Sequence, residues 1–174
     1  RNHMKFPFKT LGLLLASATL ASCGGGGGDG GAATPQSGSI TLIATRTNLP
    51  LNPNNILPYP GSPFMAEVSF TFRNSSGQIS ALTQDATFTT SSPSTVSLSP
   101  PDDPSTTNVN ELATRVVSFP ATTNNGSYVF FATSYDVAGS ATVTASAVDP
   151  ATGLTVTKTL VFTVQGATPL PAAL

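Results

Sequence analysis

Apolar and polar residues alternate along much of the chain from residue 39 onward. The clearest case is the segment Met65–Arg73, in which Ala66, Val68, Phe70 and Phe72 occupy every second position and polar residues stand between them. Successive side chains of a β-strand point to opposite faces, so this pattern predicts a strand with one buried face.

Further strands are predicted at intervals along the chain. They cover residues 39–46, 85–90, 95–99, 127–135, 140–148 and 154–164. Asn, Asp and Gly at 74–77, 124–126 and 149–153 predict turns between them. The segment 127–135 is apolar on both faces, which favours a central or covered strand. An apolar segment at 112–119 ends at Pro120 and leaves open whether the loop 100–125 adds another strand.

The pattern as a whole predicts an all-β fold. Short strands with no helical periodicity after residue 22 favour an antiparallel sandwich of about seven to eight strands, with an up-and-down barrel as the alternative. The proline-rich spans 49–63 and 100–104 predict loops that cover sheet edges, because proline lacks the donor of a central strand. Lys158 shares the phase of the apolar residues of 154–164, so either a bulge shifts the register there or the strand runs past the core.

The first residues have a different pattern from the rest of the chain. Lys5 and Lys9 precede the apolar run Leu11–Leu20, which is the layout of a secretory signal peptide and is too short to span a bilayer. The sequence Leu20-Ala21-Ser22-Cys23 resembles the lipobox of bacterial lipoproteins. That resemblance implies cleavage before Cys23, a diacylglycerol on its sulfur and an acylated amino terminus; the alternative is an ordinary signal peptide with an incidental cysteine.

These features divide the chain into four parts. We expect a signal peptide at 1–22 (1–3 being an upstream extension), the lipidated Cys23 with a glycine-rich linker at 23–38, a sandwich at 39–166 and a tail at 167–174. The linker would average about 20 Å end to end as a coil. Gly24 after the cysteine is compatible, within the lipoprotein family, with delivery to the outer membrane. Cys23 therefore predicts a lipid-mediated membrane contact in the bacterial envelope, facing the periplasm or the cell surface.

Several strand and turn sequences, taken in order, resemble the bacterial Ig-like domains of intimin and invasin. They are 65–77 (MAEVSFTFRNSSG), 85–92 (DATFTTSS), 96–99 (VSLS), 138–145 (AGSATVTA) and 158–164 (KTLVFTV). The resemblance spans about residues 39–166 and implies an Ig-like sandwich with adhesion or spacer roles. The loop 100–125 is longer than is usual for that family, and a single domain of this kind fits the sequence.

Charge and composition limit the chemistry that we expect. From Cys23 onward, four Lys and Arg residues face eight Asp and Glu residues without any basic cluster, so a nucleic-acid partner is not expected. The only cysteine is Cys23 and the only histidine is His3, which excludes an intrachain disulfide, a Ser-His-Asp triad in the mature chain and a His/Cys zinc site. No cofactor or metal is predicted, and no enzymatic activity.

A few loop residues are candidates for contact with a partner. Asp102 and Asp103 stand between prolines in a solvated turn, although a carboxylate pair for glycoside hydrolysis or a calcium site with Asp136 or Asp149 is the alternative. Tyr59 lies in the proline-rich loop, where a tyrosine contacts a protein or glycan partner or, as the alternative, packs within its own chain. Tyr128 and Tyr135 are either recognition residues or strand-end packing.

The sequence therefore predicts a non-catalytic, lipid-anchored Ig-like module that mediates adhesion, binding or spacing. Its partner, a protein or a glycan, is not identified. The alternative function is an accessory docking subunit of an envelope transport, secretion or filament assembly. An enzyme is the third hypothesis.

Overall fold

The computed structural model describes residues 36–103 and 111–166. The elements are β1 (Ser39–Ala44), β2 (Asn48–Pro50), β3 (Met65–Arg73), β4 (Ala86–Thr90), β5 (Val96–Ser99), the 3-10 helix η1 (Glu111–Ala113), β6 (Ser118–Ala121), β7 (Ser127–Ser134), β8 (Gly139–Val148) and β9 (Thr155–Gln165). The expected signal peptide, Cys23, most of the linker and the tail lie outside the described residues. Within them, no helix has the length and apolar character needed to cross a membrane.

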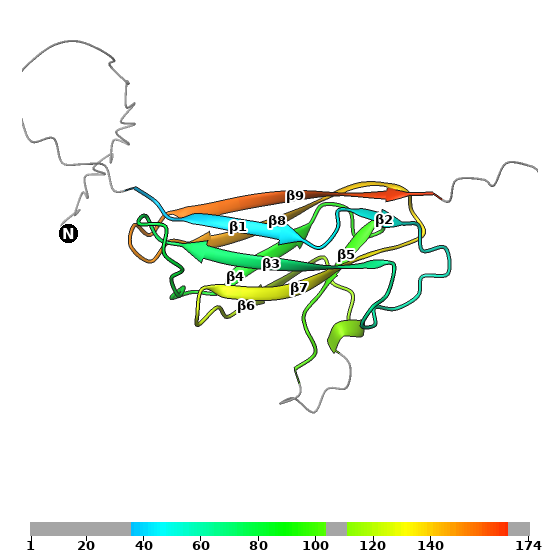
Figure 1. The fold of residues 1–174 in the computed structure, drawn as a ribbon, viewed down its shortest axis with the longest axis horizontal. Coiled ribbons are helices and arrows are strands. Elements are labelled where there is room, and N and C mark those ends of the chain that lie inside the picture. The colour runs from blue at the N-terminus through cyan, green and yellow to red at the C-terminus, as the bar shows by residue number, and fades with distance from the viewer. Residues whose placement is uncertain (1–35, 104–110, 167–174) are drawn as a thin grey trace, which may run out of the picture. The chain divides into compact units, whose positions relative to one another are not determined.

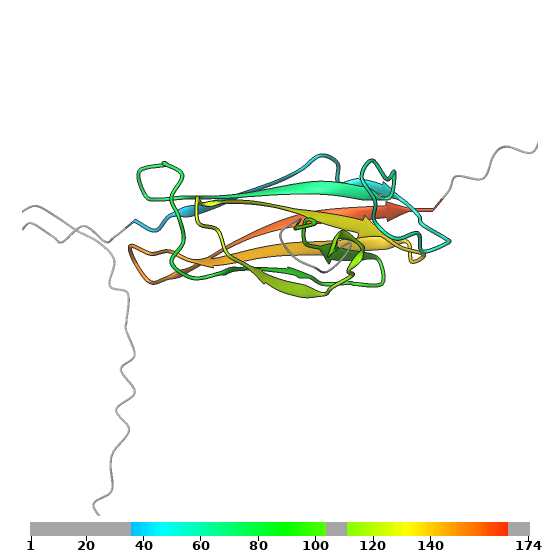
Figure 2. The same cartoon turned by 90° about the horizontal axis from the view of Figure 1, so that it is seen from below.

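The strands form two sheets packed face to face (Figures 1 and 2). One sheet has the order β1-β3-β7-β5 and the other has the order β2-β9-β8-β4-β6. If β1, β3, β4, β5, β7, β8 and β9 are lettered A to G, the sheets contain ABED and GFC, the arrangement of an immunoglobulin constant-type domain. The fold is thus an Ig-like β-sandwich, as predicted.

Two details differ from the expected sandwich. β2 runs parallel to the end of β9, pairing Asn48 with Thr163, because the chain leaves the first sheet after β1 and continues in the same direction along the second. The loop 100–125 does add a strand, β6, so that the described residues contain nine strands. Pro120 lies inside β6 instead of ending it, which is possible because β6 is an edge strand paired only with β4.

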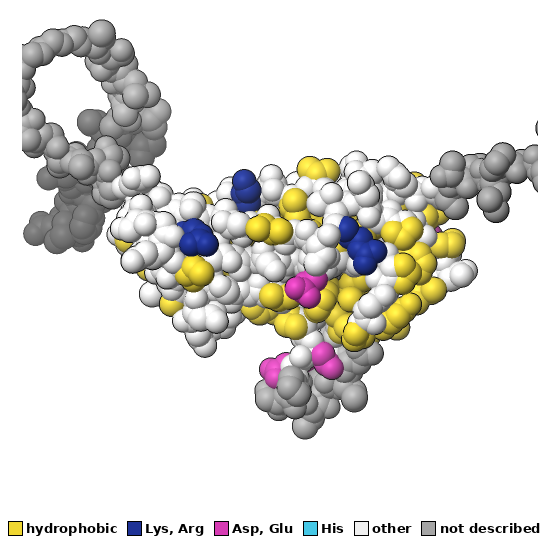
Figure 3. Space-filling view, in the orientation of Figure 1, with side chains coloured by type: hydrophobic (Ala, Val, Ile, Leu, Met, Phe, Trp, Pro, Cys, Tyr) yellow, Lys and Arg dark blue, Asp and Glu magenta, His cyan; other side chains and the backbone are white. Residues whose placement is uncertain are grey.

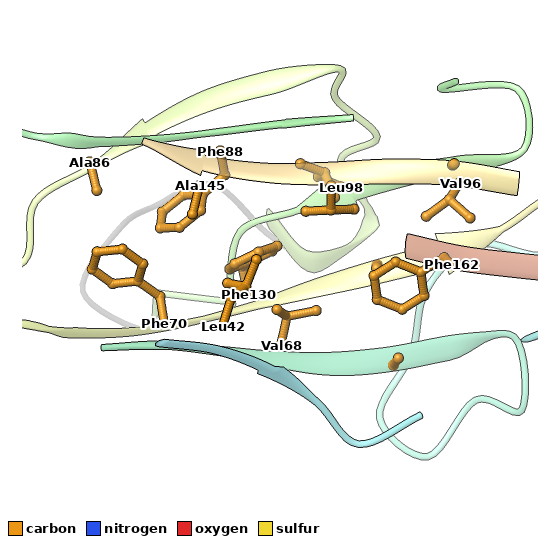
Figure 4. Close-up of a cluster of buried hydrophobic side chains, with 14 of the residues drawn as sticks. Leu42, Val68, Phe70, Ala86, Phe88, Val96, Leu98, Phe130, Ala145 and Phe162 are labelled. Carbon is orange, nitrogen blue, oxygen red and sulfur yellow. The ribbon is translucent and has the colours of Figure 1, made fainter. Parts of the chain in front are cut away.

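The core lies between the two sheets and consists mainly of the alternating residues that the sequence pattern identifies. Phe70 and Phe130 come from the four-stranded sheet, whereas Phe88 and Phe162 come from the other, and all four are fully buried (Figure 4). The centre of the Phe88 ring lies 4.5 Å from the centre of the Phe130 ring and 5.3 Å from the centre of the Phe70 ring. Aromatic contacts between the sheets therefore hold the sandwich together.

The structure resolves the position of Lys158. The register between β8 and β9 is continuous from Gly139 opposite Val164 to Val148 opposite Thr155, with no bulge at Lys158. Lys158 is exposed, and so is Leu154 before it, whereas Phe162 and Val164 are buried. The bulge, the first of the two predicted alternatives, is therefore absent, and Lys158 is exposed between Val156 and Leu160, which are partly buried against the core.

A buried carboxylate fastens the start of β1 to the loop between β8 and β9. Asp149 is only 2% exposed. It accepts hydrogen bonds from the backbone N–H of Gly38 at 2.8 Å, from that of Ala151 at 2.9 Å and from the Thr152 hydroxyl at 3.0 Å. The N–H groups of Gly38 and Ala151 hold the pKa of Asp149 below its ordinary value of 3.8.

This carboxylate predicts a loss of stability in acid. A group whose pKa is lowered by folding contributes stability above its ordinary pKa, and the contribution disappears as the pH falls through the lower, folded-state value. Asp149→Asn should therefore lower the midpoint of urea denaturation at about pH 7, and the difference from the unchanged protein should shrink at about pH 3. Asp136→Asn, at an exposed position, is the control for the charge change. Equal differences at both pH values would contradict the prediction.

Candidate functional site

The loops expected to contact a partner gather at one end of the sandwich. β1 begins opposite the end of β3, where Ser39 pairs with Arg73, and β7 ends at the other extreme, where Thr133 pairs with Met65. The connection 51–64, the turn 91–95 and the residues after Ser134 all lie at that second end, close to the end of β9 (Figure 1). We call this end, opposite to the start of β1, the distal end.

Asn52 fixes the shape of the first loop at the distal end. Its side chain is completely buried. It donates to the carbonyl oxygens of Ile56 at 2.9 Å and Ser134 at 3.1 Å, and it accepts from the N–H of Ile56 at 2.9 Å. Asn55, inside this closed turn, has a positive φ of 49°, a conformation that asparagine tolerates better than most residues. The turn thereby presents the carbonyl group of Asn55 in a fixed direction.

Arg115 connects this loop to the loop 100–125. The residues on either side of Arg115 are hydrogen-bonded to the outer edge of β5. Val116 and Leu98 exchange two backbone hydrogen bonds of 2.8 and 3.0 Å. The Ser99 hydroxyl donates to the Thr114 carbonyl at 2.6 Å. The guanidinium lies 3.6 Å from the centre of the Tyr135 ring and donates from Nη2 to the Asn55 carbonyl. Both candidate loops thus meet at one cation.

A cavity of about 290 Å³ opens beside Arg115. Its walls include Pro93, Val116 and Val117 as well as Asn55, Tyr135 and Asp136. This volume is just below the range of roughly 300–1,000 Å³ that is typical of ligand pockets.

Buried polar atoms without partners surround this cavity. Ser97 and Tyr135 also line it, and each is only 3% exposed. Their hydroxyls are near each other but form no hydrogen bond of acceptable geometry with any described group, and the same is true of Nε of Arg115. Burial raises the pKa of Tyr135 above its ordinary value of 10.0, against smaller lowering effects of Ser97 and Arg115, so its hydroxyl stays neutral. Unpaired buried polar groups are costly, which makes this cluster unusual for a purely structural core.

Tyr59 lies outside this cavity. Its side chain is 46% exposed, and the residues that follow it line a second cavity of about 290 Å³ on the outer face of the four-stranded sheet. Arg46 and Glu67 border that cavity together with the apolar residues Met65, Leu112 and Phe131. Apolar side chains are concentrated on the distal half of this face (Figure 3). The structure therefore places Tyr59 beside an apolar surface, but not with the other candidate residues.

Asp102 and Asp103 line neither of these two cavities but a third one of about 560 Å³, which Glu111 and Tyr128 also line, and they interact with η1. The N–H of Asp103 donates to the Glu111 carboxylate at 2.8 Å, and the N–H of Glu111 donates to Asp102 at 3.3 Å. These contacts join Asp102 and Asp103 to the start of η1, and both residues are exposed. Burial, and then Glu111 and Asp103, raise the pKa of the nearby Tyr128. Among the described residues, no group of three or more acidic side chains is arranged to hold a metal ion.

The other candidate residues fall on the core or outside the described part. The ring of Tyr128 stacks on that of Phe88, with 5.6 Å between the ring centres, as expected for packing at a strand end. Tyr135 follows the end of β7 and supports Arg115. Cys23 lies outside the described residues, so its lipidation stays a prediction. The described part contains neither histidine nor cysteine.

Sequence reasoning does not identify Asn52, Ser97 or Arg115. Asn52 resembles any other polar loop residue until the distant Ser134 carbonyl is placed beside it. Arg115 has one weak signal, since it is the only basic residue between Arg73 and Lys158. A lone cation in a long loop of a weakly charged chain is a reason to look for a local role.

Comparisons with known proteins give a fold likeness and no family. No protein-family description and no curated protein matches the sequence. Among solved structures, the D00-D0 domain of intimin matches with a TM-score of 0.41 and 17% identity, covering 76% of this chain and 50% of that one. A β-glycosidase from Bacteroides vulgatus matches with a TM-score of 0.44 and 15% identity, covering 72% and 14%.

A third structure, the PmoD soluble domain from Methylocystis sp. ATCC 49242 (Rockwell), matches with a TM-score of 0.36 and 13% identity, covering 72% of this chain and 90% of that one. The chain spans half or less of the intimin and glycosidase structures. All three likenesses are remote, so the assignment of the fold rests on the strand order of the molecule itself.

Proposed function

We propose that this chain is a non-catalytic, lipid-anchored Ig-like module of the bacterial cell envelope that binds a partner through its distal end. The observation that carries the proposal is the meeting of two long loops at Arg115, at the end of the sandwich opposite to the start of β1. A chain anchored through Cys23 enters the sandwich at β1. The distal end is therefore the end of the strands opposite to the point at which the linker enters the sandwich.

The chemistry of the described residues supports binding better than catalysis. Arg115 is held by stacking and by a hydrogen bond, and the groups around it are hydroxyls, apolar side chains and one carboxylate, Asp136. No nucleophile there lies beside a general base in the way that covalent catalysis requires, as far as the described residues extend. An oriented cation in a small cavity is suited to recognition.

The anchor is tested by metabolic labelling with tritiated palmitate. We expect the unchanged chain to carry the label and to sediment with membranes, whereas Cys23→Ala should carry none. Ser22→Ala, next to the cleavage site, is the control because it keeps the small residue that a lipobox needs before the cysteine. An unlabelled native chain, or a label that persists in Cys23→Ala, would show that Cys23 is not the lipidated residue.

Binding through the distal end is tested by crosslinking in intact cells. Val117 at the distal end and Leu154 at the opposite end are both exposed apolar residues, with 52% and 58% of their surface accessible. We expect Val117→Asp to abolish a crosslinked product that Leu154→Asp retains. The reverse result would place the contact at the anchored end and would contradict the proposal.

The second candidate function is an accessory docking subunit of an envelope assembly. The observation in its favour is the outer edge of β9. β2 pairs only with Thr163–Gln165, which leaves residues 155–161 without a hydrogen-bonded strand on that side among the described residues, although β1 lies close to β9. An edge of this kind can accept an added strand. Lys158, exposed on that segment, opposes such pairing, which is why binding through the distal end is the preferred proposal.

A further inference from the structure

Arg115 is a cation whose side chain is held in place beside the distal cavity. Its Nη2 group donates to the Asn55 carbonyl, and its Nε group is buried without a hydrogen-bond partner among the described residues. The Tyr135 ring and the paired backbone of Thr114 and Val116 hold the side chain in place. A guanidinium has five N–H donors, and most of these remain available at this site.

The surroundings of the cation indicate what kind of anion fits. The cavity combines the guanidinium with the apolar side chains of Pro93, Val116 and Val117, so it suits a charged group attached to a small apolar one. Asp136 also lines the cavity, and its negative charge repels a phosphate with nearly two charges more strongly than an anion with one. A planar carboxylate also matches the geometry of the guanidinium fork.

The unpaired hydroxyls support the same interpretation independently. The hydroxyls of Ser97 and Tyr135 and Nε of Arg115 are buried beside the cavity, and none of the three forms a hydrogen bond of acceptable geometry with a described group, although the two hydroxyls lie near each other. Folded proteins rarely bury several such atoms together unless a water molecule or a ligand completes their hydrogen bonding. Two hydroxyls below a cation provide further donors for an oxyanion after a small rearrangement of the site.

We propose that the cavity beside Arg115 binds the terminal carboxylate of a peptide that ends in a small apolar residue. The carboxylate contacts the free donors of Arg115, and the last side chain occupies the apolar wall formed by Pro93, Val116 and Val117. This inference deepens the proposed function by naming the chemistry of the partner. It can be tested without a membrane or a cell, so its failure is distinguishable from failure of the anchor or of crosslinking at the distal end.

The test uses the isotope-labelled full chain in detergent micelles and follows its amide signals by NMR. The probe is the dipeptide acetyl-valyl-alanine with a free carboxylate, and the same dipeptide with a carboxamide end is the neutral comparison. We expect the free acid to bind about tenfold or more tightly than the amide, since a hydrogen bond to a charged group exceeds one to a neutral group by that order. The shifted signals should belong to residues 93–97, 115–117 and 135–136.

Three variants make the result specific. Arg115→Gln should reduce binding of the acid to the level of the amide, whereas Arg73→Gln, which changes an arginine near the start of β1, should leave it unchanged. Asp136→Asn should strengthen binding of the acid severalfold, because it removes a like charge from the wall of the cavity. The Asp136 variant tests the proposal even where Arg115→Gln disturbs the fold.

Three outcomes would overturn the proposal. One is equal binding of acid and amide, which would show that no carboxylate is recognised. Another is an acid-dependent shift that Arg115→Gln does not reduce in a folded chain. The third is tighter binding of inorganic phosphate than of the dipeptide acid, with the same dependence on Arg115, which would assign the cavity to a phosphate group.

Discussion

Replacement of Phe88 by alanine should lower the free energy of unfolding by about 3–5 kcal/mol, the usual cost of removing a buried phenylalanine. Phe88 is completely buried and contacts four other aromatic rings, those of Phe70, Phe119, Tyr128 and Phe130. These rings come from both sheets and surround Phe88 closely, so the space left by the ring cannot be refilled without moving a strand. Equilibrium urea denaturation followed by circular dichroism measures the loss.

Phe119 is the matched control for this prediction. It belongs to the same aromatic cluster but lies on the edge strand β6 and is only partly buried. Phe119→Ala should therefore cost roughly half as much as Phe88→Ala, because less apolar surface is removed from the interior. Similar values for both variants, or a loss below about 1 kcal/mol for Phe88→Ala, would show that the sheets are not held together through Phe88.

Asn52→Ala should destabilise the protein by roughly 2–4 kcal/mol, although it removes no apolar contact. The substitution deletes three hydrogen bonds and leaves the carbonyl groups of Ile56 and Ser134 without these donors. Because the same turn holds the Asn55 carbonyl against Arg115, binding of the dipeptide acid should weaken as well. Urea denaturation measures the first effect, and NMR titration with the dipeptide acid measures the second.

Asn54→Ala tests whether the destabilisation expected for Asn52→Ala comes from the position of the residue in the loop or from the hydrogen bonds of its side chain. Asn54 is exposed and lies two residues after Asn52 in the same turn. Its replacement should change the free energy of unfolding by less than about 0.5 kcal/mol. If both asparagine variants were equally mild, the turn would be held by its backbone alone, and the Asn52 side chain would not fix the shape of the loop.

The sequence predicts the strands of this fold well where one face is buried. Met65–Arg73 is predicted with its observed bounds, and β8 has its four alanine and valine positions 141, 143, 145 and 147 buried as the alternation indicates. The pattern is informative because burial on one face repeats with the period of the strand. It does not indicate the partner of a strand, so neither the parallel pairing of β2 with β9 nor the continuous register at Lys158 follows from it.

The two short edge strands show a further limit of pattern reasoning. β2 and β6 each contain a proline, Pro50 and Pro120; the sequence favours a loop at the first place, and at the second it leaves open whether a strand forms. An edge strand needs backbone donors on one side only, so a proline that faces outward is tolerated. Whether a segment lies at an edge depends on the tertiary structure, and local sequence does not contain that information.

The candidate site is predictable as a region but not as a set of residues. The loops 49–63 and 100–125 are prominent because proline and polar residues interrupt the strand pattern there, and the structure joins them through Asn55 and Arg115. The exposed Tyr59 and the paired Asp102 and Asp103 attract attention by type, yet they lie elsewhere. Residues 55 and 115 are far apart in sequence, and only the folded sandwich brings them together.

The arrangement of the strand ends has a mechanical consequence. β1 starts at one end of the sandwich and β9 finishes at the other (Figure 1). A pull on these two points runs along the strands and stretches the parallel pair of β2 and β9 lengthwise. The hydrogen bonds from Thr163 to Thr47 and from Leu51 to Gln165 lie across this direction. They share the load and must yield together, so the domain should resist stretching far better than a sheet whose strands are peeled apart from one end.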